Sequence, residues 1–161
     1  MKKIVLIMGS VSDQEIVKET AEVLKQFKVP FEAKVLSAHR TPKELVKYVE
    51  SLSPKNTKVI VAYAGMAAAL SGVVAAHTTI PVIGVPIETK SLKGLDSLFS
   101  TVQMPGGIPV ACMAIGKAGA KNAAIFALEI LALNDAKIAS QLKKYKLGLK
   151  TAVIKVSKVR L

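Results

Sequence analysis

The sequence predicts an α/β fold in which a doubly wound parallel sheet lies between two layers of helices. Five short apolar runs are each followed by a segment whose apolar residues have helical spacing. This alternation is typical of parallel sheets with right-handed crossovers. The first two runs end in polar residues, at 9–13 and 37–40. The flavodoxin-like strand order 2-1-3-4-5 places those two ends side by side, so we predict that order for a three-layer fold.

The predicted strands are largely apolar, as expected for strands that are covered on both faces. They span residues 4–8, 31–36, 58–63, 81–85 and 110–115. The first predicted helix ends near residue 27, and the next three span 42–52, 67–76 and 94–102. An Ala-rich helix that ends near 133 and a helix over 135–146 follow. Thr41 and Pro42 fit the N-cap and first positions of the second helix.

The length and composition indicate one domain with a sizeable core, since the chain has 161 residues. We expect a catalytic domain over residues 1–146 and a basic tail over 147–161, whose pattern fits a strand, a helical arm or a frayed end. The sequence has no uncharged apolar run of membrane-spanning length, and the apolar start is too short for a signal peptide. The single cysteine, Cys112, excludes an internal disulfide. We therefore expect a cytoplasmic protein.

The net charge of +12 is concentrated at the C-terminal end, where Lys137 and the residues after it include eight basic and no acidic side chains. Such a segment can bind nucleic acid, but it is more often a solvated helix face. Tyr145 is the one aromatic residue within it, which argues against base stacking. Nucleic-acid binding is therefore a minor alternative, and it predicts an affinity that falls steeply with salt.

Small and hydroxyl residues follow the first strand, at Gly9, Ser10 and Ser12. The backbone can approach a phosphate closely there, the hydroxyl groups can donate hydrogen bonds, and the next helix N-terminus attracts an anion. Ser12 also fits the N-cap of a capping box with Glu15. That structural role accounts for Ser12 but not for the second serine, Ser10. Asp13 suits the first helical turn and could equally accept hydrogen bonds from sugar hydroxyls. The loop follows neither the P-loop nor the dinucleotide glycine pattern.

The second strand runs into Ser37, Ala38, His39 and Arg40. The Arg40 guanidinium suits bidentate phosphate binding. The His39 imidazole, with an unperturbed pKa near 6.5, can exchange a proton at neutral pH. The other histidine, His77, fits the C-terminal end of a helix better than a catalytic position.

The third strand ends at Ala64 and Gly65, which bring a tight backbone with little side chain into the same crevice. No second acid or base accompanies His39, and the sequence contains no convincing catalytic triad or metal-ligand cluster. The residues alone therefore predict a sugar-phosphate site with one proton-transfer group.

Six segments taken together resemble the PurE family of purine biosynthesis, in order over about residues 4–135. They are GSVSD at 9–13, SAHRTP at 37–42, PVIGVP at 81–86, GLDSL at 94–98, QMPGGIPV at 103–110 and AIG at 114–116. The closer subgroup is class I, the N5-carboxyaminoimidazole ribonucleotide mutases. The resemblance implies a flavodoxin-like octamer that moves a carboxylate from N5 to C4 of the aminoimidazole ring, without a metal or an organic cofactor.

The same resemblance implies roles for individual residues. The residue matching His39 donates and accepts the proton, and those matching Ser10, Asp13 and Arg40 hold the ribose phosphate. The full set of expected substrate-binding residues is Ser10, Ser12, Asp13, Ser37, Ala38, Arg40, Ala64, Gly65 and Leu70. The Gly65 loop and the 81–86 segment are the expected walls of a closed pocket, which would keep CO2 in and water out. The C-terminal helix is expected to cross to a neighbouring subunit.

The third loop departs from the class I pattern. Class I members usually read AGGAAHLPG there, whereas this chain reads AGMAAALSG at 64–72. Met66 thus replaces a glycine, Ala69 a histidine and Ser71 a proline. The ALSG piece is similar to class II, which carboxylates aminoimidazole ribonucleotide directly with CO2. The RSN of class II is absent, however, and RTP at 40–42 and QMP at 103–105 favour class I. The mutase is therefore the leading hypothesis and the direct carboxylase the alternative.

Overall fold

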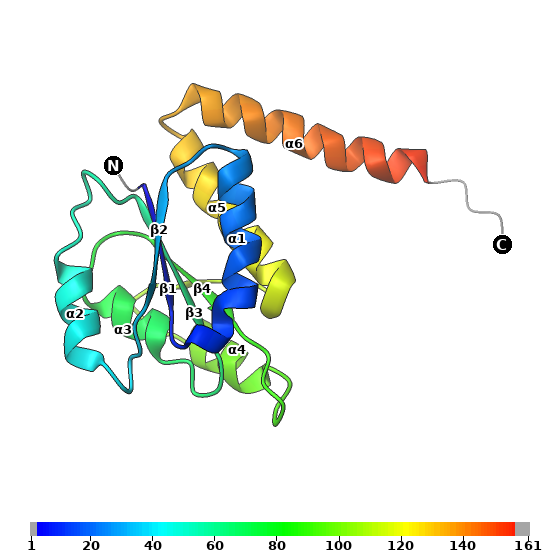
Figure 1. Ribbon diagram of the computed structural model, residues 1–161. Coiled ribbons are helices and arrows are strands. Elements are labelled where there is room, and N and C mark those ends of the chain that lie inside the picture. Colours follow the sequence, from blue (N-terminus) through cyan, green and yellow to red (C-terminus); the bar gives the residue numbers. More distant parts are fainter. Residues whose placement is uncertain (1–2, 157–161) are drawn as a thin grey trace.

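A five-stranded parallel sheet forms the centre of the computed structural model, which describes residues 3–156 (Figure 1). The strands, in chain order, are β1 (Ile4–Met8), β2 (Phe31–Val35), β3 (Val59–Ala64), β4 (Val82–Pro86) and β5 (Ala111–Cys112). Their spatial order is β2-β1-β3-β4-β5, and every pairing is parallel. The predicted fold class and strand order are therefore confirmed.

Helices cover both faces of the sheet. They are α1 (Gln14–Gln26), α2 (Pro42–Glu50), α3 (Leu70–Ala76), α4 (Leu95–Val102), α5 (Gly116–Ala132) and α6 (Ala136–Lys155), with a short 3-10 helix, η1 (Val11–Asp13), before α1. Side chains from α1 and α5 pack on one face of the sheet, and side chains from α2 and α3 pack on the other. Among the helices of the described chain, no span is both long enough and apolar enough to cross a membrane.

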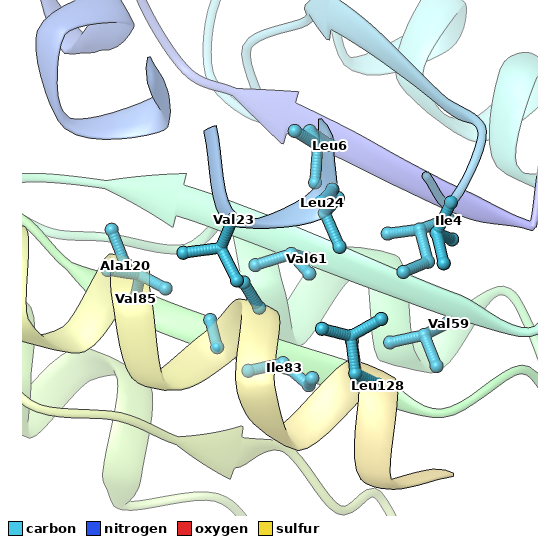
Figure 2. Close-up of a cluster of buried hydrophobic side chains, with 14 of the residues drawn as sticks. Ile4, Leu6, Val23, Leu24, Val59, Val61, Ile83, Val85, Ala120 and Leu128 are labelled. Carbon is cyan, nitrogen blue, oxygen red and sulfur yellow. The ribbon is translucent and has the colours of Figure 1, made fainter. Parts of the chain in front are cut away.

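The core on the α1 and α5 face joins alternate residues of the strands to two helices (Figure 2). Leu6 and Val61 point toward this face, whereas their neighbours Val5 and Ile60 belong to the core on the other face. β1, β3 and β4 are therefore apolar on both sides, as their continuous apolar runs predict, whereas the edge strand β2 carries Glu32 and Lys34 and is only partly covered. The core holds the sheet rigidly, so that the loops at its carboxyl edge have a fixed base.

Close contact between α5 and the end of β5 depends on Gly119. A Cβ atom at this position would lie 1.6 Å from the carbonyl oxygen of Ala114, which is far inside van der Waals contact. A buried hydrogen-bonded chain also links three elements, because the Tyr63 hydroxyl on β3 donates to Thr20 of α1, and Thr20 donates to the carbonyl of Ala120 on α5. These contacts fix α1 and α5 relative to β3.

Three elements, α3, β5 and α6, differ from their predicted bounds by more than two residues at one end. α3 begins at Leu70 and not at residue 67, because residues 65–69 form the loop that leaves β3. β5 is limited to Ala111–Cys112, although a strand was predicted over 110–115, since only Ala111 and Cys112 pair with β4. Of the three alternatives for the tail, the helical arm is found over 147–155, while 157–161 lie outside the described residues.

α6 continues without a break across the expected domain boundary at residue 146. Its first half packs on the body, where Ile138 and Leu142 are buried and the Tyr145 ring meets Phe27 edge to face with centroids 6.0 Å apart. Asp135 caps the helix by accepting a hydrogen bond from the Ile138 amide. Figure 1 shows the second half projecting away from the sheet and its covering helices. The described part of the tail therefore belongs to the projecting half of one long helix.

Candidate active site

A cavity of about 620 Å³ opens at the carboxyl edge of the sheet. All ten predicted site residues line it: Ser10, Ser12, Asp13, Ser37, Ala38, His39, Arg40, Ala64, Gly65 and Leu70. They come from the loops after β1, β2 and β3, which are neighbouring strands with their carboxyl ends at one edge. The sheet topology thus brings together three segments that are distant in sequence.

The loop after β1 is organised by a capping box between Ser10 and Asp13. The Ser12 amide donates to the Ser10 hydroxyl at 3.3 Å, and the Ser10 amide donates to Asp13 Oδ2 at 3.1 Å. The capping box predicted at Ser12 and Glu15 is therefore wrong. The chain enters η1 before α1, so Ser10, with its extended backbone (φ −150°), takes the N-cap position instead. The Ser12 hydroxyl lies 2.9 Å from the Ser10 oxygen.

The Asp13 carboxylate is buried and already holds its own loop. Its Oδ1 accepts a hydrogen bond from the Ser12 hydroxyl at 3.2 Å. Burial raises the pKa of Asp13 above its ordinary value, although the bonds from Ser12 and Ser10 and the charge of Arg40 oppose this rise. Asp13 is thus both a structural acceptor within the loop and a residue that lines the cavity.

The loop after β2 is closed by Ser37 and Thr41. The Thr41 hydroxyl accepts a hydrogen bond from the Ser37 amide at 2.9 Å and lies 3.2 Å from the Ser37 carbonyl oxygen. Thr41 therefore occupies the N-cap position of α2, with Pro42 following as predicted, but its side chain does not cap a helix amide. The hydroxyl instead closes the turn that presents His39 and Arg40.

Arg40 connects the loops after β2 and β1. Its Nη2 donates to the Gly9 carbonyl at 2.8 Å, and its Nε donates to the Ser37 hydroxyl at 3.4 Å. These bonds occupy part of the guanidinium and leave further N–H groups for a ligand. The Arg40 side chain is therefore oriented in advance at the point where the serine-rich loop and the cavity meet.

His39 is exposed on the cavity wall, next to Arg40. Within residues 3–156, its imidazole makes no hydrogen bond or ion pair with another side chain. Both ring nitrogens are thus available to a ligand. The other histidine behaves as predicted: His77 is the C-cap of α3, and its Nδ1 lies 3.2 Å from Glu50 Oε1, away from the cavity.

The loop after β3 brings backbone and few polar atoms to the cavity. A Cβ atom at Gly65 would lie 2.9 Å from Thr89 Cγ2, so this backbone packs directly on the segment that follows β4. Met66 has a left-handed backbone with φ +57°, which non-glycine residues rarely adopt. The side chains of 67–69 are all methyl groups, because these positions are alanines.

The cavity also includes residues that the predicted set leaves out. They are Gly9, Met66, Ala67, Ala68, Ala69, Ile87, Glu88 and Thr89. The last three follow β4, whose carboxyl end lies at the same edge as the other site strands. A polar pair directly after a buried strand is the signal that identifies the other loops, so Glu88 and Thr89 could have been found in the same way. Glu88 adds a second titratable carboxyl group to the cavity wall.

The arrangement suits an anionic ligand with one flat apolar part. Hydroxyl groups and a guanidinium converge from the loops after β1 and β2, whereas the loop after β3 offers backbone and methyl groups. His39 supplies an imidazole, a side chain that commonly acts as a general acid or base. Among residues 3–156, no three His, Cys, Asp or Glu side chains are grouped closely enough to hold a metal ion.

Comparisons with known proteins give one consistent result. The sequence profile of the AIR carboxylase family matches residues 3–152. An N5-carboxyaminoimidazole ribonucleotide mutase of Pyrococcus abyssi is 55% identical over 93% of this chain and 85% of the relative. A protein of the same name from Bacillus subtilis is 49% identical over 94% of both chains. The crystal structure of Treponema denticola PurE superposes with a TM-score of 0.86 at 29% identity, covering 96% of each chain.

Proposed function

Because the chain belongs to the AIR carboxylase (PurE) family, we propose that it is an N5-carboxyaminoimidazole ribonucleotide mutase of purine biosynthesis. Relatives from archaea and bacteria with this name are 47–55% identical to it over most of its length. The observation that carries the proposal is the joint placement of His39, Arg40 and Ser10 on one cavity wall. That placement combines an anion-binding group with a single proton carrier.

The ribose phosphate is proposed to bind to the loops after β1 and β2. Arg40 donates its remaining N–H groups to the phosphate, and the Ser10 and Ser37 hydroxyls, which accept hydrogen bonds within their loops, donate their own protons. Asp13, with unused lone pairs on its carboxylate, accepts from the ribose hydroxyls. Ser12, Ala38, Ala64, Gly65 and Leu70 complete the lining.

His39 is proposed to carry one proton through both halves of the reaction. Protonated His39 gives its proton to N5 as the N5–carboxylate bond breaks, which leaves aminoimidazole ribonucleotide and CO2. C4 of the ring then attacks CO2 and forms the new carbon–carbon bond. His39 takes the C4 proton and returns to its starting state. The reaction is thus balanced without an outside acid, base or oxidant.

Replacement of His39 by Asn tests this mechanism. Asn keeps a polar side chain but cannot exchange a proton near neutral pH, so we expect the turnover number for interconversion of the two carboxylated nucleotides to fall by at least about 100-fold. Because His39 is exposed and makes no bond within the described chain, the melting temperature should stay the same. A fully active His39→Asn protein would contradict the mechanism.

Direct carboxylation of aminoimidazole ribonucleotide is the second candidate. It is favoured by Ala69 and Ser71, which stand where class I members usually have histidine and proline. Labelled bicarbonate distinguishes the two reactions. A mutase keeps the carboxylate of its own substrate, so the product stays largely unlabelled, whereas a carboxylase takes label from the medium. The mutase proposal predicts product with little label.

The chain is further proposed to assemble as an octamer. Leu95, Phe99 and Val102 recur along α4 at helical spacing and form an apolar stripe, and Phe99 is 62% exposed. The projecting half of α6 exposes a second apolar group, of which Leu149 and Val153 are members. Contact between copies of the chain would bury both surfaces.

Light scattering tests the assembly. We expect wild-type protein to have the mass of eight chains and Phe99→Asp to have a lower mass, because an aspartate would be desolvated in the contact. Ser100→Asp adds the same charge to the same helix outside the stripe and should leave the mass unchanged. A monomeric wild-type protein would contradict the octamer. The cytoplasmic location expected from the sequence stays a prediction.

A further inference from the structure

Met66 has an uncommon backbone conformation in the cavity wall. Its φ of +57° lies in the left-handed region, where a Cβ atom meets the neighbouring carbonyl oxygen and glycine is strongly preferred. Strained positions of this kind persist where the surrounding structure determines them, and they gather at ligand sites. Gly65, the residue before Met66, packs closely on Thr89, so the loop has little freedom to relax.

Burial does not explain a methionine at this strained position. The Met66 side chain is 68% exposed, so it contributes little to the core of the free chain. It is nevertheless one of the residues that line the cavity. The loop around it otherwise brings only glycine and alanine to the cavity up to Leu70, whose side chain is buried. Met66 is therefore the one long, exposed side chain that this loop offers to a ligand.

We propose that Met66 covers one face of the aminoimidazole ring and thereby fixes the ring in the cavity, an inference that rests on the proposed function. The polar loops after β1 and β2 account for the sugar and the phosphate, which leaves the ring for the loop after β3. A flexible thioether packs well on an aromatic face. The side chain also excludes water from the ring when substrate is bound.

Four variants separate the side chain from the backbone strain. Met66→Ala removes the cover and keeps the left-handed backbone, whereas Met66→Leu keeps an apolar cover of similar size. Met66→Gly removes both the cover and the strain. Lys28→Gly is the matched control, because Lys28 has φ +55° at an exposed turn after α1, outside the cavity.

The measurements are KM and turnover number in the nucleotide interconversion, the melting temperature and the mass in solution. We expect KM to rise about five- to tenfold in Met66→Ala and Met66→Gly, and to stay within about twofold in Met66→Leu and Lys28→Gly. The melting temperature should rise by a few degrees in the two glycine variants alone. The mass should be the same in all of them.

Three results would overturn the inference. Met66→Ala with a KM within about twofold of wild type would show that the side chain does not contact the substrate. A changed mass in Met66→Ala would place the side chain in a contact between chains instead. A wild-type protein that neither converts nor binds the nucleotides would overturn the proposed function, and the role of Met66 with it.

Discussion

The loops after β2 and β3 flank the end of β1 on opposite sides and form two unlike walls of one cavity. The β2 wall is positioned by side-chain hydrogen bonds, such as those that Arg40 makes to Gly9 and Ser37. The β3 wall is positioned by backbone packing, where Gly65 meets Thr89 without room for a Cβ atom. A polar wall thus depends on which residues are present, whereas an apolar wall depends on how closely its backbone can approach.

Replacement of Arg40 by Met removes the charge from the β2 wall and should have the largest effect. A charge-assisted, bidentate bond to a phosphate contributes about 3 kcal/mol, so we expect KM to rise about 100-fold. Arg40→Lys keeps the charge but loses the planar guanidinium, so its KM should lie between those of wild type and Arg40→Met. Steady-state kinetics measures both. An unchanged KM in Arg40→Met would mean that this wall does not bind the phosphate.

Replacement of Gly65 by Ala tests whether the β3 wall depends on close backbone packing. The new Cβ atom would lie 2.9 Å from Thr89 Cγ2, so the segment after β4 has to move. Displacements of this kind disturb substrate position, and we expect kcat/KM to fall about tenfold. Thr89→Ser removes the methyl group and keeps the hydroxyl that donates to Asp96.

The double variant Gly65→Ala with Thr89→Ser should therefore recover most of the lost activity, while Thr89→Ser alone should be close to wild type. A double variant as impaired as Gly65→Ala would show that the collision with the Thr89 methyl group is not the cause.

Replacement of Ser71 by Ala should stabilise the protein behind the β3 wall. The Ser71 hydroxyl is buried and has no hydrogen-bond partner within the described chain, and such a group costs about 1–3 kcal/mol. We expect the melting temperature to rise by about 2–12 °C, with no change in kinetics because Ser71 does not line the cavity. Calorimetry measures the shift, and a lower melting temperature would reveal a partner for this hydroxyl.

The smallest expected effect is a pH dependence of the free energy of unfolding that is caused by Asp13. This residue lies in the loop after β1, to which Arg40 is hydrogen-bonded. Burial raises the pKa of Asp13 above the unfolded value of 3.8. The folded protein therefore holds this proton more tightly than the unfolded chain. The resulting contribution to stability is present at low pH and is lost as the pH rises through the raised pKa.

Wild-type protein should thus lose free energy of unfolding relative to Asp13→Asn between about pH 4 and about pH 7. Denaturant titrations at both pH values give the difference in free energy of unfolding between wild type and Asp13→Asn. The change of this difference with pH does not contain the constant cost of the substitution itself. A difference that grows in favour of wild type as the pH rises would mean that the pKa of Asp13 is lowered in the folded state.

The sequence by itself determined the strand order and the residues of the polar wall. Continuous apolar runs such as Ile4–Met8 identify buried strands, and Ser10 follows that run. His39 and Arg40 follow β2, a strand of mixed apolar and charged residues, and chain topology places both loops at one edge. Their chemistry follows from residue type, so a polar loop can be recognised before its geometry is known.

Only the tertiary structure decided the shape of the apolar wall and the capping of the first loop. The Gly65 contact joins residues 24 positions apart and leaves no signal in residue type, and the left-handed backbone of Met66 runs against the preference of its own side chain. Likewise, Ser10 rather than Ser12 forms the capping box, because the 3-10 turn shifts the first free amides. Backbone position is set by packing between distant segments, which local sequence patterns do not encode.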